Sequence, residues 1–212
     1  MKRNKRLKIK ELVKNHINNN IKEYVIIALL FIIGIFLGVL FVNNMQETPK
    51  AEVSNYMDNF IEKFKNTENI DRITLVKTSI FQNLTLAIII WFFGTTVIGL
   101  PVVFGMIIYR GFCLGYTIAV IISMMGISKG LLFVTISIIA QNIIAIPAIL
   151  ALAVSGFKLY KSIIKDRRKE NIKPEIIRHT IFSIIMIILL IMSSFVEIFI
   201  STEILKNTIK YF

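Results

Sequence analysis

Apolar residues in this chain come in long blocks and not in the alternating pattern of a soluble core. Blocks of about 18 or more residues with almost no charge are typical of helices that cross a membrane. The first such block, residues 24–42, has 19 residues and no charged side chain. At 1.5 Å per residue it is about 28 Å long, close to the hydrocarbon thickness of a bilayer. We therefore predict a membrane span over residues 24–42.

Four further spans are predicted in the rest of the chain. The uncharged block 79–109 is too long for one straight span, so we expect a long helix that is kinked near residues 99–101. Gly94, Gly99 and Pro101 provide the break, since proline removes a backbone donor and glycine frees the chain. An alternative is a span that ends near Gly99 and is followed by a half-helix. The other spans are predicted at residues 111–128, 130–157 and 180–200.

The polar segment 43–78 separates the first two spans and contains a predicted amphipathic helix. Its apolar residues recur at the three-and-four spacing of one helix face. They are Val53, Tyr56, Met57, Phe60, Ile61 and Phe64. This face can rest on the membrane surface, on the top of the protein's own bundle or on another protein. We select Tyr56, Phe60 and Phe64 as candidate partner-binding residues.

Charge sets the expected orientation of these spans. The net charge of +12 is concentrated in two segments: residues 1–23 hold eight Lys/Arg and two Glu, and residues 158–179 hold eight Lys/Arg and three acidic residues. Residues 43–78 hold five basic and six acidic residues. Because basic loops next to spans stay in the cytoplasm, we predict a basic cytoplasmic N-terminal tail, a basic cytoplasmic loop at 158–179 and an extracytoplasmic segment at 43–78. With five spans, the tail 201–212 is then extracytoplasmic.

These patterns together predict an all-α fold. It is a polytopic membrane helix bundle of about five transmembrane helices, with one amphipathic extracytoplasmic helix, integral to a cytoplasmic membrane. The basic segments are suited to contact membrane lipids, particularly anionic ones. They do not indicate a nucleic-acid partner, because no basic and aromatic residues are interleaved and no known binding module occurs.

The sequence contains few of the residues and motifs that are typical of catalytic sites. Cys113 is its single cysteine, and its two histidines, His16 and His179, lie in basic segments where we expect them at the solvated membrane interface. No Ser/His/Asp arrangement, Cys/His pair, phosphate-binding loop or metal-ligand spacing occurs in the sequence. We therefore expect no enzyme activity, cofactor or metal.

Four polar residues lie within or next to the apolar blocks and are candidate functional residues, because such side chains are costly in a membrane. They are Arg110, Gln141, Asn142 and Glu197. Each also has a structural interpretation. Arg110 can anchor a helix at the lipid phosphates, Gln141 and Asn142 can join two helices by hydrogen bonds, and Glu197 can be an exposed carboxylate above the bilayer.

Small and bending residues form the last group of candidates. Gly34 with Gly38, and Gly111 with Gly115, each form a G-x-x-x-G motif, which lets another helix approach closely. Such packing can occur within the bundle or between copies, so the motifs are also compatible with a homo-oligomer. Trp91, inside the second predicted span, and Pro147, inside the fourth, complete the group.

Four motifs follow one another in the second half of the chain. They are W-x-x-G-x-x-x-I-G-L-P at 91–101, R-G-F-x-x-G-Y-T at 110–117, M-G-x-x-x-G-L-L at 125–132 and Q-N-x-x-x-I-P-A at 141–148, and Glu197 comes after them. In this order and spacing the chain resembles the stage II sporulation protein M family, over nearly its whole length. A proline often precedes the Gln-Asn pair in that family, whereas Ala140 stands there in this chain.

The resemblance implies a non-catalytic membrane scaffold. Such a scaffold recruits and localises peptidoglycan-degrading enzymes, a lytic transglycosylase and an amidase/endopeptidase, at the septal or engulfing membrane of the mother cell during endospore formation. The Ile-, Lys- and Asn-rich composition is typical of a low-GC bacterium and agrees with a spore former.

Two alternatives remain open. One is a transporter or channel-like protein, which the long uncharged block and the polar Gln141, Asn142 and Glu197 favour. The other is the membrane subunit of an ABC-type system, with the basic segment 158–179 as the surface that contacts a cytoplasmic ATPase.

Overall fold

The structure is a computed structural model, and every regular element in the part of the chain that it describes is helical, which confirms the predicted all-α class. The described residues are 17–66, 72–96, 98–135, 138, 140–165 and 172–201. Most of the predicted N-terminal tail, part of the basic loop 158–179 and nearly all of the C-terminal tail therefore lie outside them.

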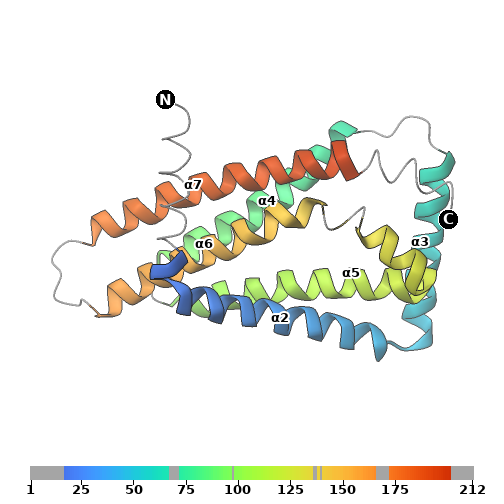
Figure 1. Cartoon of the computed structure of the whole chain (residues 1–212), viewed down its shortest axis with the longest axis horizontal. Coiled ribbons are helices and arrows are strands. Elements are labelled where there is room, and N and C mark those ends of the chain that lie inside the picture. Colours follow the sequence, from blue (N-terminus) through green and yellow to red (C-terminus); the bar gives the residue numbers. More distant parts are fainter. Residues whose placement is uncertain are drawn as a thin grey trace.

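Five of the described helices are long and apolar enough to cross a membrane. The membrane helices run roughly along the long axis of the molecule, and α3 lies across one end of them (Figure 1). The elements are α2 (Ile21–Asn43), α3 (Glu47–Asn66), α4 (Arg72–Gly94), α5 (Leu100–Val134), α6 (Ala140–Lys165), α7 (Lys173–Val196) and the π-helical η2 (Glu197–Ser201).

The region predicted as one kinked helix over 79–109 is two helices, so that prediction was wrong. α4 ends at Gly94, and α5 begins at Leu100 with Pro101 in its first turn and runs back towards the end of the molecule from which α4 came (Figure 1). The Thr96 hydroxyl donates a hydrogen bond to the carbonyl of Phe93 at the end of α4. A Cβ at Gly99 would lie 2.1 Å from that same carbonyl oxygen, so the tight return needs glycine.

Because the chain reverses between α4 and α5, the later helices begin and end at other residues than predicted. Arg110 does not end a span but lies inside α5, so the predicted boundary between 79–109 and 111–128 does not exist. α5 bends instead at Gly126, whose φ of 76° is a left-handed conformation that favours glycine. A tight turn was predicted at this point, and the segment after it folds back on α5: a Cβ at Gly130 would lie 2.9 Å from the Cα of Ile122. α6 then begins at Ala140 and not at residue 130.

The two G-x-x-x-G motifs pack against each other and join α2 to α5. A Cβ at Gly34 or Gly38 would lie 2.2 or 2.3 Å from a backbone carbonyl oxygen of α5. A Cβ at Gly111 or Gly115 would lie 2.3 or 2.2 Å from a carbonyl oxygen of α2. The small residues therefore let the backbones of α2 and α5 touch within one chain. All four glycines take part in this contact inside the bundle.

A second close approach involves α4, α6 and α7. A Cβ at Gly94 would lie 3.1 Å from the Cα of Gly156 and 3.2 Å from Nε2 of His179. His179 is 2% exposed, and its Nδ1 lies 2.9 Å from the Ser155 hydroxyl. The expectation of a solvated interfacial histidine was wrong, because α6 and the glycine of α4 cover the ring.

The apolar core is centred on α6, which packs against α2, α4, α5 and α7. Its largest fully buried side chains include Ile149 and Leu152 of α6, together with Ile27, Ile90 and Leu190 from three neighbouring helices. Side chains on the outward faces are mostly apolar and exposed, such as Ile32 and Phe36 of α2. This is the pattern of helices surrounded by lipid.

Candidate functional site

The four intramembrane polar residues selected from the sequence line one cavity. Arg110 of α5, Gln141 and Asn142 of α6, and Glu197 of η2 surround a volume of about 220 Å³. Cys113, Leu114, Thr117 and Ile138 complete its walls. The structural interpretations treated these polar groups one by one, and only the transporter alternative grouped Gln141, Asn142 and Glu197. The fold brings all four groups, Arg110 included, to a single place.

Arg110 provides the positive charge of this cavity. It lies ten residues after Leu100, about 15 Å along α5 and therefore near half of a bilayer's hydrocarbon thickness. No hydrogen bond joins its guanidinium to another of the described residues, but it lies close enough to Glu197 for electrostatic attraction. A place in the interior of a spanning helix contradicts the interpretation of Arg110 as an anchor at the lipid phosphates.

Glu197 provides the negative charge of the cavity, and a residue of α4 binds its carboxylate. Its carboxylate accepts a hydrogen bond of 2.5 Å from the Ser79 hydroxyl. One turn further along α4, the Asn83 side-chain amide donates a 2.8 Å hydrogen bond to the Ser194 hydroxyl. Glu197 is therefore a half-buried group that joins helices, and not an exposed carboxylate above the bundle.

Ser79 and Asn83 were not selected from the sequence. The signal for them was present, since they are four residues apart in a mostly apolar helix and match Ser194 and Glu197, which are three residues apart. Polar residues at such spacing share one helix face, so two matching pairs on different helices indicate a polar contact between those helices.

The Gln-Asn pair lies in the first turn of α6. The side-chain amide of Asn142, which is 9% exposed, donates a 2.8 Å hydrogen bond to the backbone carbonyl of Ile138. Asn142 therefore binds the chain just before its own helix and does not bridge two helices by that donor. Gln141 is half-buried and lines the cavity beside it.

A larger and mainly apolar cavity adjoins the polar one. Its volume is about 620 Å³, and it shares Thr117, Ile138 and Glu197 with the polar cavity. Its other lining residues are Val120, Ile121, Phe133 and Tyr116 on the bundle side and Glu52, Val53 and Tyr56 on α3. The polar cavity is thus continued by an apolar space that leads to α3.

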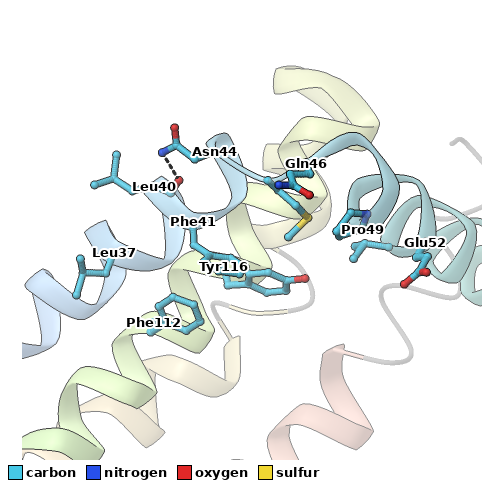
Figure 2. Close-up of a pocket in the computed structure, with 11 residues that line it drawn as sticks. Leu37, Leu40, Phe41, Asn44, Gln46, Pro49, Glu52, Phe112 and Tyr116 are labelled. Atoms are coloured by element: carbon cyan, nitrogen blue, oxygen red, sulfur yellow. Dashed lines mark hydrogen bonds between the residues drawn. The ribbon is translucent and has the colours of Figure 1, made fainter.

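A third cavity of about 770 Å³ lies where the chain passes from α2 to α3. Figure 2 shows the rings of Phe41, Phe112 and Tyr116 gathered between α2 and α5, with Pro49 and Glu52 of α3 beyond them. The ring centroids of Phe112 and Tyr116 are 6.2 Å apart. This cavity shares Glu52 and Tyr116 with the apolar one, so the three cavities form a series from the end of the bundle to Arg110.

The candidate partner-binding residues lie on α3. Tyr56 is 73% exposed, and the side chains of Phe60 and Phe64 lie outside the described residues. In the part of the chain that is described, α3 has no extensive contact with any membrane helix, although Val53 and Tyr56 line the apolar cavity. The backbone of α3 therefore lies away from the membrane helices along most of its described length.

The remaining predicted residues pack or shape helices away from the cavities. The indole N–H of Trp91 donates a 3.3 Å hydrogen bond to the Thr180 hydroxyl and thereby joins α4 to α7. Pro101 lies in the first turn of α5, where a proline costs no helix hydrogen bond. Pro147 lies inside α6 and is exposed.

Comparison with known proteins identifies similar sequences but no similar solved structure. Residues 27–202 match the family model described as Stage II sporulation protein M. An uncharacterized protein of Methanocaldococcus jannaschii is 28% identical over 184 residues, which cover 85% of this chain and 94% of that protein. No solved structure matches the chain. The matched range includes every residue that lines the polar cavity.

Proposed function

The chain belongs to the stage II sporulation protein M family and is an integral membrane protein, and from this premise we propose that it is a non-catalytic scaffold. The scaffold recruits and localises peptidoglycan-degrading enzymes at the septal or engulfing membrane during endospore formation. Its proposed partners are a lytic transglycosylase and an amidase/endopeptidase. Its proposed location is the mother-cell membrane, with the N-terminus cytoplasmic and the C-terminus extracytoplasmic.

The observation that carries the proposal is the position of α3. This helix of 20 residues lies across the end of the bundle and packs little against the membrane helices (Figure 1). In the proposed orientation it faces the peptidoglycan side, because its segment lacks the basic excess of the cytoplasmic ones. A helix with one apolar face and few contacts of its own is suited to bind a groove on a partner.

Co-purification tests the docking surface. Wild-type protein is compared with a triple variant, Tyr56→Ala, Phe60→Ala and Phe64→Ala, for recovery of the two hydrolases after mild solubilisation. The matched control changes three polar residues on the other face of α3, Asn55→Ala, Asp58→Ala and Glu62→Ala. We expect the aromatic variant to lose the hydrolases and the control to retain them. Equal recovery with all three proteins would contradict docking through this face.

A deletion strain tests the cellular role. We expect cells without the protein to start septation but to fail in engulfing the forespore, as seen by membrane-dye microscopy. Complementation with the wild type restores engulfment, and complementation with the aromatic variant of α3 does not. Normal engulfment in the deletion strain would refute the sporulation function and leave the membrane fold unaffected.

A transport function is the second candidate, and the series of three cavities favours it. Charged and amide groups from α5, α6 and η2 meet inside the membrane, and spaces of about 620 and 770 Å³ lead from them towards α3. Transporters hold their substrates at such intramembrane polar sites. Liposomes that contain the purified protein and show no solute flux beyond that of empty liposomes would reject this candidate.

A further inference from the structure

We propose that the polar cavity and the apolar cavity beside it form one binding site for a small zwitterion with an apolar side chain, the chemistry of an apolar α-amino acid. The anionic group of the ligand binds Arg110, its ammonium group binds Glu197, and its side chain occupies the apolar cavity. The proposal rests on neither the scaffold function nor transport, although Val53 and Tyr56 of α3 line the apolar cavity.

The charges of the polar cavity favour a ligand that carries both signs. Arg110 and Glu197 line the same space of about 220 Å³ and attract each other. A ligand with a net charge would leave an uncompensated charge in a low-dielectric interior, which is costly. A zwitterion pairs each of its groups with one protein charge and keeps the site neutral. The arrangement therefore disfavours simple anions and simple cations.

Hydrogen-bonding capacity in the cavity suits the same ligand. The guanidinium of Arg110 can donate two parallel hydrogen bonds to a carboxylate. The carboxylate of Glu197, which accepts a hydrogen bond from the Ser79 hydroxyl, carries the negative charge that pairs with an ammonium group. Gln141 also lines the cavity, and its side-chain amide both donates and accepts hydrogen bonds.

The apolar cavity gives room for a side chain. Val120, Ile121 and Phe133 form much of its wall, and its volume of about 620 Å³ lies in the range of about 300–1,000 Å³ that is usual for small-molecule sites. It meets the polar cavity at Thr117, Ile138 and Glu197, so one ligand can reach both spaces. Glycine would leave this second space unfilled and should bind weakly.

A matched set of ligands tests the proposal on full-length protein in detergent by isothermal titration calorimetry. L-leucine carries all three required parts. 4-Methylpentanoate lacks the ammonium group, 3-methylbutylamine lacks the carboxylate, and glycine lacks the side chain. We expect leucine to bind at least about tenfold more tightly than each of the other three, which corresponds to about 1.4 kcal/mol or more.

Variants locate the site. Arg110→Gln and Glu197→Gln are each expected to weaken leucine binding at least about tenfold, whereas the matched controls Arg178→Gln and Glu175→Gln, an ion pair near the start of α7, keep it. Thr117→Phe fills the junction of the two cavities without a change of charge and is expected to abolish binding. Thermal melting and size-exclusion chromatography show which variants remain folded. If a charge variant does not fold, Thr117→Phe still tests the proposal.

Three results would overturn the proposal. The first is that leucine does not bind at millimolar concentrations. The second is that 4-methylpentanoate or 3-methylbutylamine binds as tightly as leucine. The third is that leucine binds the folded cavity variants as tightly as it binds the wild type.

Discussion

The contact between α2 and α5 leads to a sharp prediction about packing. In Gly34→Ala, the new methyl group would lie 2.2 Å from the carbonyl oxygen of Ile108, whereas ordinary contacts of this kind begin at 3.4 Å. In Gly115→Ala, it would lie 2.2 Å from the carbonyl oxygen of Ile35. The neighbouring atoms are backbone, so no flexible side chain can yield. The two helices must therefore separate locally by about 1.2 Å.

The cost of this separation follows from the lost contacts. A gap of 0.5–1 Å already removes about a quarter to a half of the dispersion energy between facing atoms, and overpacking of a tight interface costs about 1–3 kcal/mol. Because two backbones are in contact here, we expect the upper part of that range, about 2–3 kcal/mol. For a chain of this length, each kcal/mol shifts the melting temperature by about 2–4 °C, so a fall of at least about 4 °C is expected.

Cys113 provides the assay. It is the single cysteine of the chain, it is half-buried, and it lies in α5 between Gly111 and Gly115 of the interface. A thiol-reactive fluorescent dye added during heating therefore reports when α5 leaves its neighbours. Gly105→Ala is the matched control, because a Cβ at Gly105 meets no atom within 4 Å. Melting of Gly34→Ala and Gly115→Ala at the same temperature as Gly105→Ala would refute the contact.

Three further predictions test other parts of the bundle by the same melting assay. In a double-mutant cycle, Asn83→Ala and Ser194→Ala should be coupled by about 0.6 kcal/mol, the average for such bonds in membranes, and additive effects would show that their hydrogen bond contributes nothing. His179→Ala should destabilise by about 1–3 kcal/mol, since it removes the bond to Ser155 and empties a buried site, and a wild-type melting temperature would contradict that packing. Gly126→Ala should cost about 1–3 kcal/mol through the backbone alone, because a φ of 76° with a ψ of 167° is a conformation adopted essentially by glycine and no atom lies within 4 Å of the new Cβ, and a stabilised variant would show that the bend is absent.

The membrane helices and α3 were predictable because their signals are local. A block without charge becomes a membrane helix whatever lies beside it, since each backbone polar group is satisfied inside the helix. The three-and-four spacing around Tyr56 likewise predicts the amphipathic α3 without knowledge of its neighbours. The G-x-x-x-G motifs could be recognised for the same reason, although neither motif indicates which helix packs against it.

The break between α4 and α5 is a feature that local sequence signals do not determine. Glycine and proline in an apolar block indicate that a helix is interrupted, but a kink and a full reversal use the same residues. The choice depends on what packs against the returning chain. Here Gly99 lies tightly against Phe93, and α5 contacts α2 along the glycines Gly34 and Gly38. That contact cannot form if the chain continues straight.

The polar cavity is the clearest case of a feature that tertiary structure decided. The sequence by itself determined that Arg110, Gln141, Asn142 and Glu197 are costly in a membrane, because that cost belongs to each side chain and its apolar surroundings. Their meeting in one cavity depends on how far each helix is rotated and shifted along its axis. Those two quantities are set by packing between helices, chiefly the backbone contact of α2 with α5 and the Ser79–Glu197 bond between α4 and η2. Hydrophobicity along the chain determines which segments enter the membrane, and only the close packing of those segments decides which polar groups face one another.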